Sequence, residues 1–236
     1  MSTRVDKNNV QKFLKHTSES VRDRARVNSG SSKLRSMVNV FPFPSLGLHL
    51  KAAEFVVRVK YRLGLQIFPY EGMCVACPAV SETSGDHAVS CGWGGERTNR
   101  HDAIRDCLFS TCVQSCLGPT RKDRALIPSR QARPADIYLP SWSGGLDTAL
   151  DITVINPLQQ TLMDRSAANP GHALQVAFDR KMSRHGEDCR TAGIAFMPLP
   201  LDTLGAWGES TVREVKRMGA PLPDTRGERN RKSSDT

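Results

Sequence analysis

Four residues with metal-binding side chains follow one another in the pattern C-x2-C-x9-H-x3-C. They are Cys74 and Cys77 in the segment CVAC, then His87 and Cys91 in GDHAVSC. A CxxC pair can chelate from a tight turn, and two ligands four residues apart can share one helical turn. Three thiolates and one imidazole complete a tetrahedral Zn²⁺ shell with no open position, which is typical of a structural site. We therefore predict a structural zinc knuckle over residues 70–98.

The other cysteines are scattered along predicted helices, where we expect small buried apolar side chains. They are Cys107, Cys112, Cys116 and Cys189. His101 is a competing zinc ligand, but it lies ten residues beyond Cys91, a long gap for a compact knuckle. Capping a helix or orienting its neighbours is the role we expect for His101.

Two aspartates lie in otherwise apolar, β-rich segments: Asp136 in ARPADIYL and Asp151 in ALDITV. A turn at residues 141–145 would fold the two segments into a hairpin and bring both carboxylates to one face. Asp is disfavoured within strands, and shared binding of a hard cation such as Mg²⁺ would explain both residues. The alternative is that they end strands and face solvent or pair with an arginine such as Arg133.

A Mg²⁺ ion held by this pair could lower the pKa of a bound water and stabilise charge on a phosphate during phosphodiester cleavage. Such a reaction also needs a cation beside the attacking water. Lys181, in DRKMSRHGEDC on the following predicted helix, is the best-placed candidate, and Arg180 and Arg184 are lesser ones. If the acids do bind a cation, these residue types would serve hydrolysis of a phosphodiester.

Taken together, these motifs resemble the C-terminal region of non-LTR retrotransposon polyproteins. There, a reverse transcriptase is followed by a CCHC zinc motif and a restriction-endonuclease-like nuclease of the PD-(D/E)XK class. The resemblance rests on RPAD-x14-D with a downstream Lys, preceded by CVAC, GDHAVSC and NRHDAIRD. It also takes in SLGLHL, KYRLGL, DITVINPLQ and PLDTLGAWG, and so covers roughly residues 22–208. The sequence contains no Tyr-x-Asp-Asp motif of a polymerase.

The resemblance implies roles for individual residues. Asp136 would be the acid of the PD half-motif and Asp151 the second acid. Thr153 stands where such nucleases usually carry Lys, and Lys181 would be that lysine displaced to the next helix. Ala135 separates the proline of the half-motif from its aspartate, which departs from the family pattern.

The acid expected on the first nuclease helix stays open between Asp102 and Asp106. The resemblance implies a Mg²⁺-dependent endonuclease that nicks target DNA for target-primed reverse transcription in the nucleus. DNA and element RNA would be its partners, beside a reverse transcriptase normally in the same polyprotein. The alternative is a catalytically inactive, zinc-containing, nucleic-acid-binding remnant of such a polyprotein.

Apolar periodicity and breaker residues predict an α+β fold. We expect helices over residues 6–28, 49–64, 100–116, 172–188 and 202–218. We expect short strands within residues 124–129, 133–140, 148–156 and 193–200. With the resemblance, this order predicts a restriction-endonuclease-like mixed sheet flanked by helices, preceded by a zinc knuckle and a basic helical segment.

The chain has 236 residues and a formal net charge of +9, and this charge is unevenly distributed. Residues 1–73 hold 13 Lys and Arg against 5 Asp and Glu, a net charge of +8. Such a segment is either a surface that meets phosphates or an ordinary solvated basic helix. Its helices lack the broad apolar face of a membrane-surface helix.

Four segments follow from these patterns. They are a basic helical linker (1–69), a CCHC zinc knuckle (70–98), a nuclease domain (99–218) and a disordered tail (219–236). We expect an intracellular protein without membrane partners, because the sequence has neither a run of 18 apolar residues nor the apolar stretch of a secretory signal.

Overall fold

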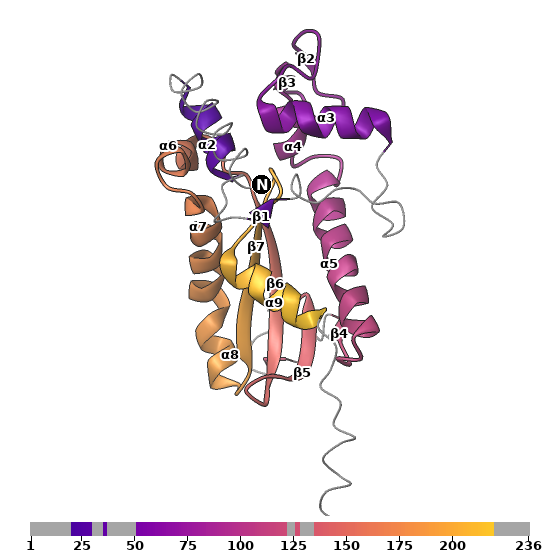
Figure 1. Cartoon of the computed structure of the whole chain (residues 1–236), viewed down its shortest axis with the longest axis vertical. Coiled ribbons are helices and arrows are strands. Elements are labelled where there is room, and N and C mark those ends of the chain that lie inside the picture. The colour runs from indigo at the N-terminus through magenta and orange to yellow at the C-terminus, as the bar shows by residue number, and fades with distance from the viewer. Residues whose placement is uncertain (1–19, 30–34, 37–50, 122–125, 128–134, 220–236) are drawn as a thin grey trace, which may run out of the picture.

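The computed structural model describes residues 20–29, 35–36, 51–121, 126–127 and 135–219. Their centre is a six-stranded mixed β-sheet with helices on both faces (Figure 1). In spatial order the strands are β1 (Arg35–Ser36), β8 (Ala206–Trp207), β7 (Ala195–Asp202), β6 (Leu146–Ile155), β5 (Ile137–Ser143) and β4 (Thr120–Arg121). The predicted mixed α/β architecture, with a sheet flanked by helices, is confirmed.

Strands β5 and β6 form the predicted antiparallel hairpin. Gly144 and Gly145 make its turn, and both have positive φ (60° and 82°), which glycine adopts without steric cost. The register pairs Ile137 with Leu150, and both side chains are fully buried. The hairpin therefore has one fixed apolar face and a defined alignment of the residues beside it.

Strand β6 continues the sheet by pairing in parallel with β7 along eight of its residues, from Thr148 to Ile155. A parallel pair needs a crossover connection, and here it is helical. The crossover consists of α6 (Gln160–Ala168), α7 (His172–Lys181), a π-helical turn η3 (Met182–Gly186) and α8 (Glu187–Thr191).

The sheet is covered by two layers of helices. On one face lie α5 (Glu96–Gln114) and α9 (Glu209–Met218). Leu150 and Ile152 of β6 point to this layer and join a buried cluster with Leu108 and Met218. The alternate residues of β6 pack toward α7 and α8 on the other face. A side chain's place in β6 thus decides which helices it meets.

The earlier part of the chain adds a small layer at one end of the sheet (Figure 1). Its elements are α2 (Val21–Ser29), α3 (Ala52–Leu63), β2 (Gly72–Met73), β3 (Val80–Ser81) and α4 (Asp86–Ser90). Helix α2 lies against α6. Ala25 and Tyr61 share a buried cluster with Leu158 and Leu204, so the basic first part packs onto the part that carries the sheet.

Most of the predicted helices are present. Those expected at 49–64 and 100–116 are confirmed as α3 and α5. Of the helix expected at 6–28, residues 21–28 are helical within α2, and 6–19 lie outside the described residues. The helix expected at 172–188 is interrupted by the π-helical turn η3.

Two predictions of secondary structure were wrong, and one helix was missed. The segment 124–129 was expected to form a strand, but its described residues Leu126 and Ile127 form a bend, and the edge strand is β4. Helix α6 was not expected. The last helix begins at Glu209 and not at Asp202, because Asp202 ends the long buried strand β7.

Two of the four cysteines expected to be buried are exposed. Cys112 and Cys189 have no exposed surface, as predicted, whereas Cys107 and Cys116 are exposed. Helix α5 buries one stripe only, and Cys107 lies outside it. Cys116 follows the end of α5 with a positive φ of 56°, which turns it away from that stripe.

The predicted tail, residues 219–236, lies outside the described residues except for Gly219. Among the helices that the structure describes, not one combines the length and the apolar character needed to cross a membrane.

Asp202 joins three parts of the fold. Its carboxyl accepts hydrogen bonds from the backbone N–H groups of Leu204 (2.9 Å) and Ala206 (2.8 Å) and from the Ser29 hydroxyl (2.5 Å). Arg62 of α3 donates to Ser29 Oγ at 3.2 Å. Burial raises the pKa of Asp202 to about 6, against the opposing effect of these hydrogen bonds and of Arg62.

Replacing Asp202 with Ala is expected to destabilise the protein by about 2–4 kcal/mol, because two buried backbone N–H groups lose their acceptor. Asp202→Asn keeps an acceptor oxygen and should cost much less. Urea denaturation at pH 7, followed by circular dichroism, measures both free energies of unfolding.

Comparison of the wild type with Asp202→Asn tests the raised pKa of Asp202. Its folded pKa of about 6 lies above that of an unfolded carboxyl, so the folded state binds the proton more tightly. The stability of the wild type relative to Asp202→Asn should therefore rise as the pH falls from 7 to 5. A difference that stays constant over this range would contradict the raised pKa.

Candidate metal centre and acidic site

The structure brings the four predicted zinc ligands together. The ligand atoms of Cys74, Cys77, His87 and Cys91 all lie within 4.8 Å of one another. Cys74 Sγ is 4.0 Å from Cys91 Sγ, and Cys77 Sγ is 3.3 Å from His87 Nε2. With Zn–S bonds of about 2.3 Å, two ligands of a tetrahedral zinc ion are separated by roughly 3.8 Å. The cluster could therefore bind a metal such as zinc.

Local hydrogen bonds shape this cluster. The Cys74 N–H donates to the carbonyl of Ala79 (2.9 Å) and closes the β2–β3 turn. The Ala76 N–H donates to Cys74 Sγ (3.4 Å), and this bond is the main cause that lowers the pKa of Cys74 to about 6. The lowered pKa favours the thiolate of Cys74, the form that binds metal. The backbone N–H of His87 donates to the Glu82 carboxylate at 2.6 Å.

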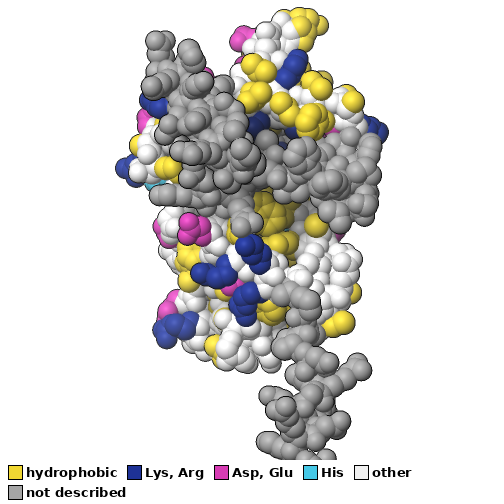
Figure 2. Space-filling model, viewed as in Figure 1, with side chains coloured by type: hydrophobic (Ala, Val, Ile, Leu, Met, Phe, Trp, Pro, Cys, Tyr) yellow, Lys and Arg dark blue, Asp and Glu magenta, His cyan; other side chains and the backbone are white. Residues whose placement is uncertain are grey.

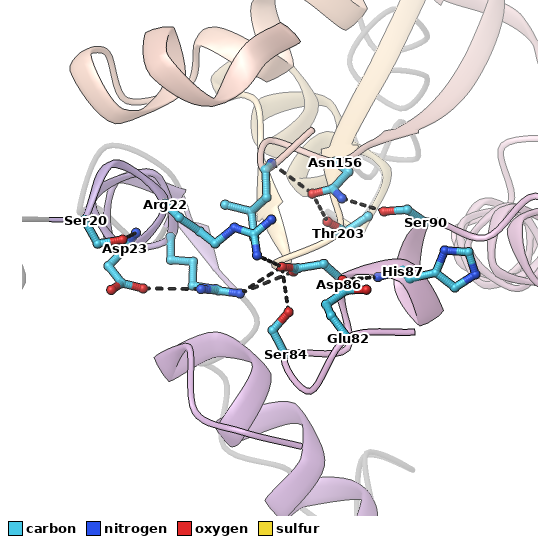
Figure 3. Close-up of polar contacts among 12 residues, drawn as sticks. Ser20, Arg22, Asp23, Glu82, Ser84, Asp86, His87, Ser90, Asn156 and Thr203 are labelled. Carbon is cyan, nitrogen blue, oxygen red and sulfur yellow. Dashed lines mark hydrogen bonds and ion pairs between the residues drawn. The ribbon is translucent and has the colours of Figure 1, made fainter. Parts of the chain in front are cut away.

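Asp86, the neighbour of His87, anchors the metal cluster to the rest of the protein (Figure 3). Its buried carboxylate contacts Arg22 (2.5 Å) and Arg26 (3.2 Å) of α2 and accepts a hydrogen bond from Ser84 (3.0 Å). Sequence analysis missed this network, because Arg26 and Asp86 are 60 residues apart and no local pattern relates them.

A second link joins the metal cluster to the sheet. Asn156, directly after β6, donates to Ser90 Oγ at 2.6 Å and accepts from Thr203 at 3.2 Å (Figure 3). Ser90 precedes the ligand Cys91. The cluster is thus held close to the end of the central strand.

The two predicted acids lie side by side across the hairpin. Asp136 directly precedes β5, and its backbone N–H donates to the carbonyl of Leu150 at 2.8 Å. Asp151 follows Leu150 in β6, so the register of the hairpin places it opposite Asp136, which is close enough to raise the pKa of Asp151. Asp136 Oδ2 also accepts the backbone N–H of Ile152 at 2.8 Å. Both side chains are largely buried, with 14% and 8% of their surface exposed.

Lys181 reaches the acid pair from α7, on the face of the sheet opposite α5. It is the last residue of α7, and its Nζ lies 2.8 Å and 3.0 Å from the two oxygens of Asp151. The lesser candidates Arg180 and Arg184 are exposed. Thr153, where the family pattern has its usual lysine, is partly buried in β6. Of the three candidate cations, Lys181 is the one in contact with Asp151.

His101 of α5 contacts the acid pair and not the metal cluster. Its Nε2 is 3.0 Å from Asp136 Oδ2, and its Nδ1 is 3.3 Å from Asp102 Oδ1. Arg105 binds both acids that were candidates for the first helix, Asp102 at 2.5 Å and Asp106 at 2.9 Å. Asp102 is the one connected to Asp136, through His101.

The environments of the two acids push their pKa values apart. Burial raises the pKa of Asp151 to about 6, and Asp136 adds to this while Lys181 opposes it. Burial acts in the same direction on Asp136, but the hydrogen bond and charge of His101 prevail and lower the pKa of Asp136. The hydrogen bond to Asp136 in turn raises the pKa of His101. Burial therefore makes the charged form of Asp151 costly, and a cation bound beside it would offset that cost.

Comparison with family models, with curated proteins and with solved structures found no match to this chain. What the two sites can do chemically must therefore be inferred from their residues and geometry.

The purified protein is expected to hold one zinc ion in the cluster, and Cys77→Ser should release it more readily, because one of four ligands is weakened. Zinc release to a chromophoric chelator measures the affinity. Replacing the metal with Co²⁺ should give the absorption bands of tetrahedral thiolate coordination in the wild type.

Cys107→Ser is the matched control, since Cys107 is an exposed thiol outside the cluster. It should leave metal content and the Co²⁺ spectrum unchanged. Equal loss of metal in the two variants would refute the ligand assignment.

Proposed function

We propose that this protein is a Mg²⁺-dependent DNA endonuclease derived from a retroelement. It would nick a DNA strand whose 3′ end then primes reverse transcription by the parent element. The observation that carries the proposal is the hairpin register that places Asp136 opposite Asp151, with Lys181 bound to Asp151. The resemblance to the nuclease region of non-LTR retrotransposon polyproteins supports it, because these three residues are the ones that the family pattern selects.

Asp136 and Asp151 would hold the Mg²⁺ ion. Carboxylate oxygens are the ligands that this cation prefers, and the raised pKa of Asp151 is consistent with a site that gains by binding a cation. When bound, Mg²⁺ would polarise the phosphate and lower the pKa of a water molecule. The two acids would thereby set the position of the phosphodiester.

Lys181 would place a positive charge beside the phosphate. Its Nζ already lies within hydrogen-bond distance of Asp151, so the ammonium is held at the acid pair before substrate arrives. Fixed positive charge at the point where negative charge develops stabilises the transition state. The π-helical turn that begins at Met182 is a rare backbone form often found at functional sites.

The metal cluster and the basic first part of the chain would hold nucleic acid. Arg58 and Lys60 of α3 lie near the cluster's end of the molecule, and Trp93, 64% exposed, follows the ligand Cys91. Figure 2 shows exposed apolar side chains gathered there and a group of Lys and Arg side chains lower down, over α9. Basic side chains suit phosphates, and an exposed indole can stack on a base.

The partners that follow from this proposal are DNA, element RNA and a reverse transcriptase of the parent element. A chromosomal DNA substrate implies action in the nucleus. Zinc in the Cys₃His cluster would be structural, since the four ligands leave no open position.

A second candidate function is nucleic-acid binding without catalysis, as in an inactivated remnant. Two observations favour it: Ala135 interrupts the half-motif, and Thr153 replaces the usual lysine. A protein that shifts DNA in a gel but never nicks it, at any Mg²⁺ concentration, would support this alternative.

Asp136→Ala and Asp151→Ala are each expected to abolish Mg²⁺-dependent nicking of supercoiled plasmid, because either change removes a cation ligand. DNA binding should be largely retained, and a gel-shift assay measures it in parallel.

The matched control is Asp179→Ala, which removes an exposed acid of α7 outside the pair. It should nick at the wild-type rate. Undiminished nicking by both acid-pair variants would show that the assignment is wrong.

Lys181→Ala is expected to lower the nicking rate by about 100-fold or more, as loss of one charge that stabilises a transition state does. Arg180→Ala removes the neighbouring exposed cation and should lower the rate only slightly. Single-turnover rates at saturating Mg²⁺ compare the two, and equal losses would point to a general effect of positive charge on DNA binding.

A further inference from the structure

His101 has hydrogen-bond partners on both sides of its ring. On one side Nε2 faces Asp136 Oδ2 at 3.0 Å and the carbonyl oxygen of Ile152 at 3.2 Å. A carbonyl oxygen can only accept, so Nε2 carries the hydrogen and donates it. On the other side Nδ1 faces Asp102 Oδ1 at 3.3 Å. The ring therefore bridges α5 to the start of the hairpin.

The contact with His101 leaves the two oxygens of Asp136 unequal. Oδ2 receives both the Ile152 N–H and the His101 Nε2–H. Both donors are fixed, one in the central strand and the other on a helix packed against the sheet. Oδ1 receives neither of these donors, and it belongs to the carboxyl that lies opposite Asp151.

The ring of His101 is itself held in place. Asp102, its partner at Nδ1, is bound by Arg105, whose side chain is only 9% exposed. The helix is fixed near this point, because Arg100 donates to the carbonyl oxygen of Val89 at 2.9 Å. Partners behind a hydrogen-bonding ring set its orientation, as they do for histidines around metal sites.

We propose that His101 is a positioning residue that fixes the Asp136 carboxyl so that Oδ1 is presented to a divalent cation. Its effect on cleavage rests on the nuclease function proposed above, but its effect on cation binding does not. The imidazole acts through its hydrogen bond, and it touches neither the cation nor the DNA.

Two variants separate this role from that of a nearby positive charge. His101→Ala removes the donor and suits a helix interior. His101→Gln offers an amide N–H in place of Nε2–H but carries no charge. If the hydrogen bond matters, His101→Gln should keep the cation affinity that His101→Ala loses. If the ring acted as a repelling charge, both variants would bind a cation more tightly than the wild type.

The experiment titrates the full-length zinc-loaded protein with Mn²⁺ and follows the free ion by electron paramagnetic resonance. His101→Ala is expected to bind Mn²⁺ on the order of 10-fold more weakly, as losses of supporting partners around metal sites typically do. His101→Gln should stay within a few fold of the wild type. Asp151→Ala defines the binding that occurs outside the acid pair. Zinc content should be unchanged in both His101 variants, and the thermal midpoint of each should show that it is folded at the assay temperature.

Nicking rates at several Mg²⁺ concentrations complete the test. His101→Ala should need more Mg²⁺ for half-maximal rate, and His101→Gln should not. Equal or tighter Mn²⁺ binding by His101→Ala would overturn the proposal, as would failure of Gln to restore it. If the wild type did not nick but the Mn²⁺ affinities followed the expected order, the nuclease function would fail and the role of His101 would stand.

Discussion

The antiparallel register of β5 and β6 is the constraint on which the acidic site depends. Because Ile137 lies opposite Leu150, the residues just outside this pair, Asp136 and Asp151, must lie opposite each other. A shift by one residue would turn the apolar face of the hairpin to the wrong layer and separate the acids. The burial of Ile137 and Leu150 therefore stabilises the fold and aligns the two carboxyls at the same time.

The other residues that contact the acid pair are positioned by the elements that pack around the hairpin. Parallel pairing of β6 with β7 requires the helical crossover, which brings Lys181 at the end of α7 to Asp151. Helix α5 covers the opposite face and carries His101 to Asp136. It begins only five residues after the ligand Cys91. The metal cluster, itself tied to α2 through Asp86, thus lies next to the start of the helix that supports the acid pair.

What the sequence could predict depends on how far apart the partners are along the chain. The Cys₃His ligands span 18 residues, so their spacing alone indicated the cluster. The acids were predictable through the hairpin, because a glycine turn lies between them. Arg26 and Asp86 are separated by 60 residues, and neither residue type indicates a partner. His101 was expected to orient a neighbour, but only the fold identifies that neighbour as Asp136.

The charges around the acid pair fit the proposed nuclease function better than a purely structural role. Lys181 is bound to Asp151 and His101 to Asp136, yet burial still raises the pKa of Asp151 to about 6. A buried ion pair that served stability alone would gain little over apolar side chains of similar size. Here His101 lowers the pKa of Asp136 while burial raises that of Asp151. Two neighbouring acids with pKa values moved in opposite directions, beside a lysine, are typical of a site where charge changes during a reaction.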